Sequence, residues 1–322
     1  MARFIAVLGG GISGYGSAIL AKKQGFEVLL SDMGQIAPHY RARLDEWGVE
    51  YEEGGHSVER ILTASEVIKS PGIPDKAPMV KALREKGVPV ISEMEFACRY
   101  MGKAKTICIT GSNGKTSTVE LMAHMLKECG YSVAYNKEGS NQIEGVTTFI
   151  LSNATLSGKV KGDVLLIESD ERYAKYTFKH FAPTHYVITN LYRDQLTRNG
   201  HPEWVYDVIS ECMDDSMELI LNADDPLVSR FGKDRDKVRY FGADRLSFDE
   251  EENNSVYHDG KYCPCCKSPM EYEYYHYNHI GKYNCKNCGH KRNDTQWTIT
   301  DASLEEGFVT VNGKYKIEIS FS

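Results

Sequence analysis

One short glycine-rich segment constrains this chain more than any other feature. It reads Gly111-Ser112-Asn113-Gly114-Lys115-Thr116 and directly follows an apolar run of strand type at residues 105–110. Two glycines and the start of a helix leave backbone N–H groups unpaired, and these groups can surround a triphosphate. Lys115 can reach the terminal phosphates, and the hydroxyl of Thr116 can ligate Mg²⁺. The strand before the segment and the helical pattern at residues 118–128 favour a phosphate-binding loop over a turn with a chance lysine.

Length and charge exclude several classes of protein. The chain has 322 residues, enough for about two domains that each bury a core, and its net charge is −7. This charge disfavours a general nucleic-acid binder. No apolar stretch approaches the roughly 18 residues that a membrane span needs. The amino terminus enters a strand without a cleavable export signal, so we expect a cytoplasmic protein.

Strand and helix patterns alternate along most of the chain, which predicts the α/β class with parallel sheets. We expect a Rossmann-like domain over residues 1–100 and a second domain over residues 101–322. The expected strands are residues 4–8, 27–31, 66–70 and 88–92 in the first domain, and 106–110, 132–135, 163–168, 184–189 and 217–221 in the second. The closing stretch, residues 297–322, alternates in a β fashion.

A second glycine pattern lies near the amino terminus. Gly9, Gly11 and Gly14 form G-x-G-x-x-G between an expected strand and helix, and Asp32 ends the next expected strand. This arrangement is typical of a nucleotide site, in which a diphosphate lies on the helix start. Taken alone the signal is weak, because many strand-to-helix turns with these glycines bind nothing.

Four cysteines predict a metal site. Cys263-x₂-Cys266 and Cys285-x₂-Cys288 are separated by 18 residues, a spacing that places four thiolates around one tetrahedral Zn²⁺. A closed four-cysteine site is structural, so we expect a zinc ribbon over residues 256–292. Cys265 is then a spare thiol that could pair in another way, and His276, His279 and His290 are expected to pack rather than bind metal. The interleaved tyrosines could stack bases or fill a small core.

Polar residues follow the expected strands of the second domain, where open parallel sheets bind ligands. Glu168 ends a strand and could hold Mg²⁺ together with Thr116, the alternative being a solvated strand end. Arg193 and Asp194 follow another strand. A third strand leads into an Asn-Ala-Asp-Asp-Pro turn that contains Asn222, Asp224 and Asp225, and an ordinary capping turn is its alternative.

These motifs resemble the Mur ligases, the amide-forming enzymes of peptidoglycan synthesis. The phosphate loop has their G-[ST]-N-G-K-T form, and residues 1–135 resemble the MurD branch in segments 7–14, 31–33, 69–74 and 91–96. The resemblance implies that the first domain binds a UDP-sugar, through Gly11, Ser13, Gly14, Asp32, Ser70, Pro71 and Gly72. It also implies ATP contacts from Gly111, Ser112, Asn113, Gly114, Lys115, Thr116, Ser117, Asn222, Asp224 and Asp225.

From residue 136 onward the chain is more similar to the MurT branch, the ligase-like subunit of lipid II isoglutaminyl synthase. The resemblance is carried by segments 136–141, 168–171 and 189–196 and by the cysteine cluster. It implies amidation of the D-glutamate of lipid II, with ammonia from a GatD-like glutaminase partner. Gln195 stands where MurD ligases have a metal-ligating histidine, which counts against full MurD chemistry.

The resemblance implies transfer of the γ-phosphoryl group of ATP to a carboxylate, followed by attack of an amine or ammonia. Lys115, Glu168, Arg193 and Asp194 would serve this chemistry, with Mg²⁺ on Thr116 and Glu168. A MurD-like ligase acting on UDP-MurNAc-L-alanine and a non-catalytic nucleotide-binding or zinc-ribbon scaffold remain alternatives. Nothing in the sequence corresponds to the third Mur-ligase domain. The MurD-like first part and the MurT-like second part together indicate a composite chain, and without that third domain we expect it to be a weak or inactive catalyst alone.

Overall fold

The computed structural model describes residues 3–102, 104–136, 141, 143–154, 162–193, 201–254 and 257–319. The chain separates into two compact units. The first consists of Met1–Thr106, Val119–Ser169 and Tyr176–Phe181, and the second of Ile107–Thr118, Asp170–Lys175 and Ala182–Ser322. The predicted domain boundary near residue 100 stays a prediction.

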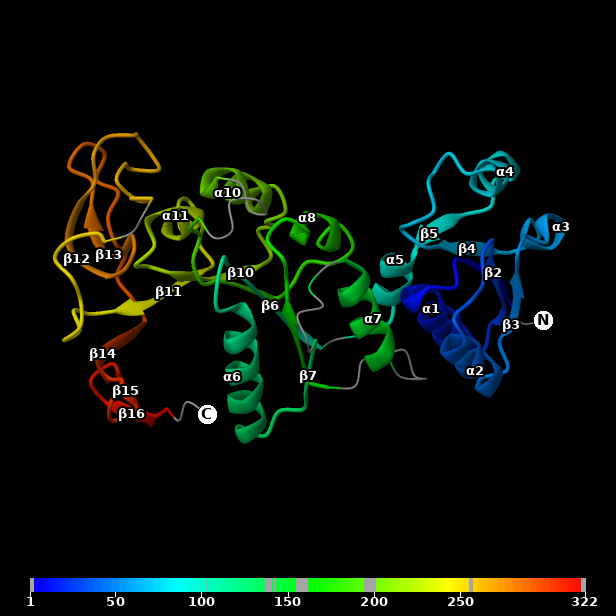
Figure 1. Cartoon of the computed structure of the whole chain (residues 1–322), viewed down its shortest axis with the longest axis horizontal. Helices are drawn as coiled ribbons and strands as arrows, with labels where there is room; N and C mark the ends of the chain where they lie inside the picture. The colour runs from blue at the N-terminus through cyan, green and yellow to red at the C-terminus, as the bar shows by residue number, and fades with distance from the viewer. Residues whose placement is uncertain are drawn as a thin grey trace. The chain divides into compact units, whose positions relative to one another are not determined.

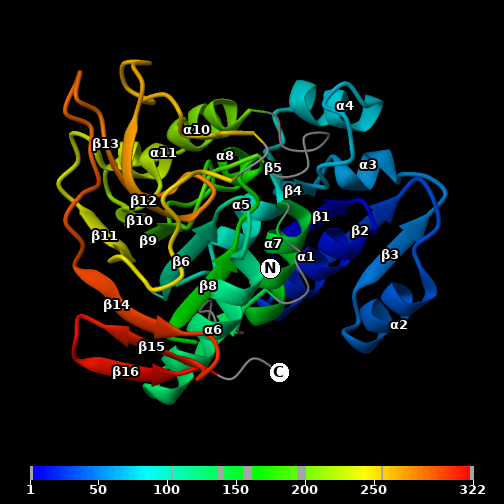
Figure 2. The ribbon, with the colours of Figure 1, turned by 60° about the vertical axis from the view of Figure 1, so that its left-hand side comes forward.

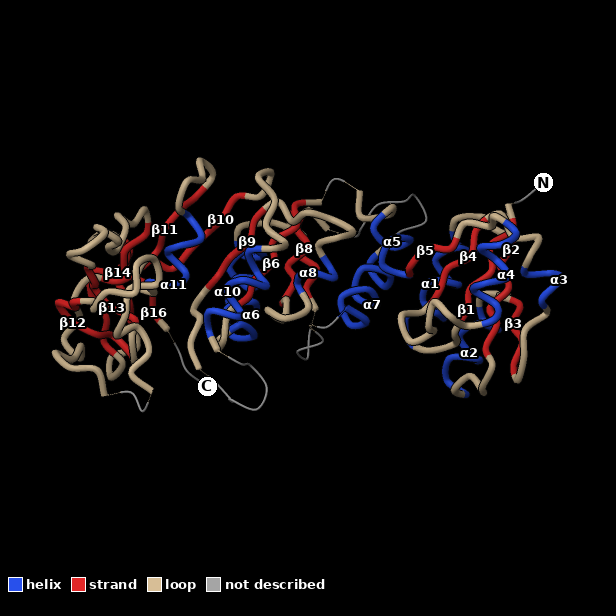
Figure 3. The backbone as a smooth tube through the Cα atoms, turned by 90° about the horizontal axis from the view of Figure 1, so that it is seen from above, coloured by secondary structure: helices blue, strands red, loops and turns tan. Residues whose placement is uncertain are grey.

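The first unit contains a parallel sheet with the strand order β3-β2-β1-β4-β5, drawn in blue to cyan in Figure 1. The predicted Rossmann-like parallel sheet is thereby confirmed. Its strands are β1 (Phe4–Leu8), β2 (Glu27–Asp32), β3 (Glu50–Glu53), β4 (Glu66–Lys69) and β5 (Val90–Ser92). The intervening helices are α1 (Ile12–Lys23), α2 (Pro38–Glu46), α3 (Val58–Ile61), α4 (Pro78–Lys86) and α5 (Glu93–Cys98). Helices α1, α2 and α4 pack beside these strands (Figure 3).

Burial explains why these segments fold as strands. Leu8 of β1, Leu29 of β2 and Val67 of β4 are buried in one apolar cluster, together with Leu83 of α4. Burial on both faces favours the continuous apolar runs that the sequence shows here. Strand β3 has the sequence Glu-Tyr-Glu-Glu and lies at the sheet edge, so it lacks the apolar run that would have predicted it.

The second sheet has the strand order β16-β15-β14-β11-β10-β9-β6-β8-β7. Its central strands run parallel, whereas β14, β15 and β16 pair with one another antiparallel, and the alternation at residues 297–322 had predicted strands here without their direction. The strands are β6 (Lys105–Thr110), β7 (Val133–Tyr135), β8 (Val164–Glu168), β9 (His185–Ile188), β10 (Glu218–Asn222), β11 (Val238–Ala243), β14 (Trp297–Ser303), β15 (Phe308–Val311) and β16 (Tyr315–Glu318). The associated helices are α6 (Lys115–Glu128), α7 (Ile143–Asn153), α8 (Ala174–Thr177), α10 (Pro202–Ser210), α11 (Pro226–Ser229) and the 3₁₀ turn η1 (Arg230–Gly232).

An antiparallel hairpin is inserted between β11 and β14. It consists of β12 (Glu271–Tyr277) and β13 (Ile280–Asn284), joined by Asn278 and His279. Asn278 takes a φ of +51°, a value that asparagine tolerates better than most residues. Figure 2 shows this hairpin, in orange, beside β10 and α11. Among the described residues, no helix combines the length and apolarity needed to cross a bilayer.

Candidate functional site

The glycine-rich segment connects β6 to α6, the strand-to-helix context that the sequence predicted. Gly111 has a φ of +149° and Gly114 a φ of +74°, backbone conformations that favour glycine. A Cβ atom on Gly111 would lie 2.1 Å from Oγ1 of Thr189, so the close approach of a neighbouring loop also requires glycine. Helix α6 begins at Lys115, three residues before the predicted helical stretch at residue 118.

Lys115 lies at the base of this loop. Its ammonium donates a hydrogen bond to the carbonyl oxygen of Gly111 and lies 2.9 Å from a carboxylate oxygen of Glu171. The Glu171 side chain is only 2% exposed, so this ion pair is shielded from water. The sequence had assigned no separate role to Glu171. The available signal was its place in an acidic run just after a buried strand.

The residues after β9 hold the loop in place, and we call residues 189–193 the bracing segment. Asn190 accepts a hydrogen bond from the backbone N–H of Asn113 at 3.0 Å and donates one to its carbonyl at 3.2 Å. The Ser112 N–H donates to the Asn190 carbonyl at 2.8 Å. The side-chain amide of Asn113 donates to the Tyr192 hydroxyl, and the Tyr192 N–H donates to Oγ of Ser112. The loop therefore has a fixed conformation, and sequence reasoning had missed Asn190 and Tyr192.

Glu168 ends β8, as predicted, and is buried. Its carboxylate accepts a hydrogen bond from Nδ2 of Asn141 at 2.8 Å, and Asn136 bonds to both its backbone N–H and its carbonyl. These contacts orient the carboxylate at the strand end. Thr116 is the second residue of α6 and belongs to the other compact unit, so the Mg²⁺ pair of Thr116 and Glu168 stays a prediction.

The acidic turn after β10 is buried and already has protein partners. The carboxylate of Asp225 accepts hydrogen bonds from the N–H groups of Leu227 and Val228 and so caps α11. Asp224 pairs with the guanidinium of Arg292. Burial raises the pKa of Asp224, and the nearby Arg292 only partly offsets this effect. Contacts of these carboxylates with a nucleotide stay a prediction.

Two further predicted contact residues of the second unit lie at the same edge. The Asn222 side chain donates to the carbonyl of Thr189 at 2.9 Å. Nε of Arg193 lies 3.0 Å from Asp259. Asp194 and Gln195 lie outside the described residues. A cavity of about 630 Å³ adjoins Arg193, and its lining includes Leu191, Pro226, Leu227 and residues 257–262.

In the first unit, the glycine turn also follows a parallel strand. Both carboxylate oxygens of Asp32 accept backbone hydrogen bonds, one from Gly10 and the other from Gly34. A Cβ atom on Gly14 would lie 1.9 Å from the Gly9 carbonyl oxygen, so Gly14 permits α1 to pack closely on β1. Nothing lies within 4 Å of a Cβ atom placed on Gly11.

The other residues predicted for a UDP-sugar lie at the same ends of the parallel strands. Ser13 is buried in the first turn of α1. Ser70 follows β4 and donates to the buried carboxylate of Glu93, whereas Pro71 and Gly72 are exposed. The carboxyl ends of the neighbouring strands β1, β2 and β4 thus lie together at one edge of the sheet. Binding of a nucleotide sugar there stays a prediction.

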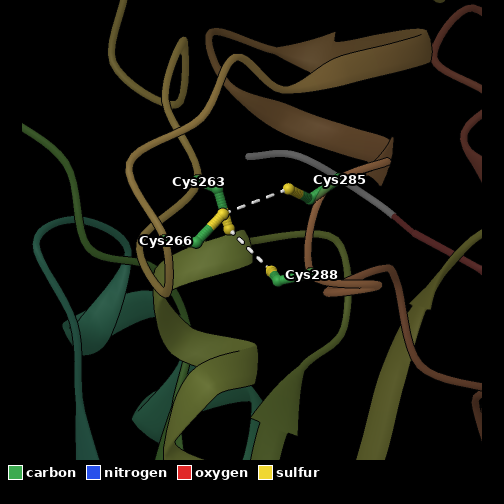
Figure 4. A group of neighbouring side chains, drawn as sticks. All are labelled: Cys263, Cys266, Cys285 and Cys288. Atoms are coloured by element: carbon green, nitrogen blue, oxygen red, sulfur yellow. Dashed lines mark hydrogen bonds between the residues drawn. The ribbon is translucent and has the colours of Figure 1, made fainter.

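The four predicted cysteines form one cluster (Figure 4). Their sulfur atoms all lie within 4.8 Å of one another. The sulfurs of Cys263 and Cys288 are 3.6 Å apart, and those of Cys266 and Cys285 are 3.5 Å apart. A tetrahedral zinc site with Zn–S bonds of about 2.3 Å needs sulfurs roughly 3.8 Å apart. The cluster therefore fits a Zn²⁺ ion.

The two Cys-x₂-Cys turns, here called knuckles, share one backbone pattern. The N–H groups of Cys263 and Cys285 donate to the carbonyls of Ser268 and His290, each at 2.8 Å. The residues after the second cysteine of each pair, Lys267 and Gly289, have φ values of +62° and +75°. Two equivalent turns on facing segments are typical of a structural zinc ribbon.

The neighbouring aromatic residues pack, as expected. His276, His279 and His290 lie outside the sulfur cluster and contact Asp249, Asp225 and the Pro226 carbonyl, respectively. Tyr272 stacks on Tyr275 with ring centroids 4.4 Å apart. Cys265 is exposed and does not belong to the cluster.

Family models and curated proteins match the sequence of this chain. A model described as Mur ligase middle domain matches residues 109–289, and one described as Mur ligase MurD-like, N-terminal domain matches residues 3–92. A UDP-N-acetylmuramoylalanine--D-glutamate ligase of Bacteroides fragilis is 55% identical over 129 residues, which are 40% of this chain and 29% of that protein. The corresponding ligase of Porphyromonas gingivalis is 36% identical and covers 70% of this chain and 49% of its own length.

A second kind of relative also matches. The lipid II isoglutaminyl synthase (glutamine-hydrolyzing) subunit MurT of Staphylococcus aureus is 35% identical over 217 residues, or 66% of this chain and 48% of that protein. The chain thus spans half or less of the length of these curated relatives.

Solved structures agree on the fold. A pseudomurein peptide ligase type C from Methanothermus fervidus superposes with a TM-score of 0.69 at 25% identity, covering 99% of this chain and 63% of that one. A murein peptide ligase from Psychrobacter arcticus gives a TM-score of 0.58 at 17% identity, covering 100% of this chain and 62% of that one, a likeness of fold alone. With the middle-domain model matching more than half of its residues, the chain belongs to the Mur ligase family.

Proposed function

We propose that this chain binds ATP and Mg²⁺ and transfers the γ-phosphoryl group to a substrate carboxylate, and that an amine or ammonia then displaces the phosphate to form an amide. The phosphate loop between β6 and α6 supports the binding step, because its backbone N–H groups and the start of α6 suit a triphosphate. The named relatives are ligases, which supports the amide-forming step.

The placement of Lys115 carries this proposal. Its ammonium lies on the carbonyl of Gly111, inside the loop, rather than in solvent. Triphosphate binding would draw the ammonium from Gly111 and Glu171 toward the terminal phosphates. There it would offset the negative charge that develops on the transferring oxygens.

Two metals accompany this function. Mg²⁺ would be held by Thr116 and Glu168 and would neutralise phosphate charge. Glu168 is buried and held by Asn141, which fixes the direction of its carboxylate. Zn²⁺ would be held by the four clustered cysteines in a structural role.

The nucleoside of ATP would occupy the cavity of about 630 Å³. Leu191 of the bracing segment and Pro226 of the acidic turn border this cavity, so it adjoins the turn that the sequence assigned to the nucleotide. Arg193 borders it as well and would orient the substrate, a role that we also assign to Asp194.

We favour a MurT-like role, in which the D-glutamate of lipid II is amidated with ammonia from a GatD-like glutaminase partner. The four-cysteine cluster supports this choice, because it is the feature in which the sequence resembles the MurT branch. The MurT subunit of Staphylococcus aureus is among the relatives.

A MurD-like role is the second candidate, with UDP-MurNAc-L-alanine and D-glutamate as substrates. The first unit supports it, because its MurD-like sheet ends in the glycine turn and in Asp32, which a UDP-sugar would approach. Gly11, Ser13, Gly14, Ser70, Pro71 and Gly72 complete this proposed pocket.

Release of ADP from ATP distinguishes these roles. The chain is assayed with lipid II and a GatD-like glutaminase plus glutamine, with lipid II alone, and with UDP-MurNAc-L-alanine plus D-glutamate. ADP release that requires the glutaminase supports the MurT-like role, and release without a partner on the UDP substrate supports the MurD-like role. Nucleotide binding without turnover in every set would support a scaffold and contradict the ligase proposal.

A further inference from the structure

One residue at the tip of the ribbon hairpin is buried, although a two-residue turn is usually exposed. His279 at this tip is 2% exposed, and its Nε2 atom lies 3.6 Å from the Asp225 carboxylate. The next strand is attached as well, because the Gly281 N–H donates to the Asp224 carbonyl at 2.9 Å. The ribbon is therefore anchored on the acidic turn after β10.

The same hairpin contacts the bracing segment. The ring of Tyr192 meets Tyr277 edge to face, with centroids 5.9 Å apart, and lies 6.3 Å from the ring of His279. Before the first cysteine pair, Asp259 accepts a hydrogen bond from the Arg193 N–H and pairs with the Arg193 side chain. One face of the bracing segment thus packs against the ribbon.

The bracing segment also makes contact with the phosphate loop. The hydroxyl of Tyr192 accepts a hydrogen bond from the side chain of Asn113, and the Tyr192 N–H donates to Ser112. Tyr192 therefore touches the ribbon through its ring and the loop through its hydroxyl and backbone. Asp225 forms a second connection, because one of its carboxylate oxygens lies near His279 and accepts the Leu191 N–H at 2.8 Å.

We propose that the cysteine ribbon positions the phosphate loop for the nucleotide through the bracing segment, with Tyr192 as the positioning residue between them. This inference rests on the proposed ATP binding. A phosphate is bound well only when several loop N–H groups point at it together, so a support that fixes the loop lowers the ordering cost of binding.

The proposal differs from a purely local role of the ribbon. A ribbon that only stabilised its own fold would leave nucleotide affinity unchanged when its contact with Tyr192 is altered. A ribbon that positions the loop must change nucleotide affinity, and by linkage the bound nucleotide must change zinc affinity by the same factor.

The mildest test is Tyr192→Phe in the full chain. This change keeps the ring beside Tyr277 and removes only the hydroxyl that bonds to Asn113. Dissociation constants for a non-hydrolysable ATP analogue with Mg²⁺ are measured by calorimetry, together with zinc content and thermal melting. We expect roughly three- to tenfold weaker binding, as for the loss of one hydrogen bond, with zinc content unchanged.

Tyr275→Phe is the matched control. Tyr275 lies on the same strand as Tyr277 and stacks on Tyr272, so its hydroxyl can be removed within the ribbon without altering Tyr192. We expect the affinity of Tyr275→Phe for the ATP analogue to lie within twofold of that of the unaltered chain. An equal loss of affinity in both variants, or no loss in Tyr192→Phe, overturns the proposal.

Removal of zinc with a chelator gives a second measurement. We expect at least about tenfold weaker binding of the ATP analogue, and slower release of zinc when the analogue is bound. If the stripped chain unfolds in circular dichroism, Tyr277→Ala replaces this measurement, because it removes the ring of the ribbon that meets Tyr192, and unchanged affinity for the analogue in that folded variant overturns the inference. Unchanged affinity in a folded, zinc-free chain overturns the inference while the proposed function stands, whereas no binding by the unaltered chain refutes the proposed function itself.

Discussion

Nε2 of His279 lies 3.6 Å from Oδ2 of Asp225, and both side chains are buried. The pair joins residues on two separate elements, the tip of the ribbon hairpin and the turn after β10. The turn that sequence reasoning assigned to the nucleotide therefore also anchors the ribbon. Stability and the proposed nucleotide binding would therefore depend on the same few residues in this part of the molecule.

Substitution His279→Leu should destabilise the second unit. The change leaves the buried Asp225 carboxylate with its backbone hydrogen bonds but without its ionic partner, which lowers the free energy of unfolding by about 3 kcal/mol. Chemical denaturation measures the loss. His124→Leu, at an exposed position on α6, serves as the control and should cost less than about 0.5 kcal/mol. Equal stability of the two variants would contradict a role for the buried pair.

The stabilisation from His279 should depend on pH. Burial by itself lowers the pKa of His279, but the carboxylates of Asp225 and Asp259 outweigh it, so the pKa lies above its ordinary value of 6.5. A raised histidine pKa stabilises the folded state fully below about pH 6.5, and this contribution is lost as the pH rises through the folded-state pKa. The stability gap between the unaltered chain and His279→Leu should therefore shrink between pH 6 and pH 9. A gap that grows over this range would show the opposite linkage.

Zinc binding should depend on the four clustered thiols and not on the nearby thiol of Cys265. We expect one zinc ion per chain, measured by elemental analysis, and its loss in Cys285→Ser together with a lower melting temperature. Cys265→Ser is the matched control, because Cys265 is exposed and outside the cluster. Full zinc content in Cys285→Ser, or loss of zinc in Cys265→Ser, would show that the ligand set is wrong.

The two glycines of the first turn should respond differently to alanine. Gly14→Ala places a Cβ atom 1.9 Å from the Gly9 carbonyl and should lower the free energy of unfolding by about 2 kcal/mol or more. Gly11→Ala meets nothing within 4 Å and should cost less than about 1 kcal/mol. Urea denaturation compares the two variants. Similar losses of stability in the two variants would mean that close packing of α1 on β1 is not what requires glycine at position 14.

Periodicity and glycine placement predicted most of this fold. The buried parallel strands were recognised because they are continuous apolar runs, and the phosphate loop because its glycines follow one of them. Strand β3 was missed because it is short, acidic and at an edge. The cysteine spacing predicted the sulfur cluster, since two knuckles are local structures that need only one distant contact.

The partners of the site residues could not be predicted in the same way. An acidic residue after a strand looks the same whether it meets a ligand or another part of the chain. Asp224 finds Arg292, 68 residues away, and Lys115 finds Glu171, 56 residues away. Such pairs are set by packing of distant segments, and no local pattern in the sequence records them.

Equilibrium binding of a non-hydrolysable ATP analogue with Mg²⁺ tests the central claim most directly. The unaltered chain should bind it, and Lys115→Ala should weaken binding at least about tenfold, because the loop loses the ammonium that meets the terminal phosphates. Lys127→Ala, at an exposed position on the same helix, should bind like the unaltered chain. Equal affinity of Lys115→Ala and Lys127→Ala, or no binding by the unaltered chain, would contradict the account.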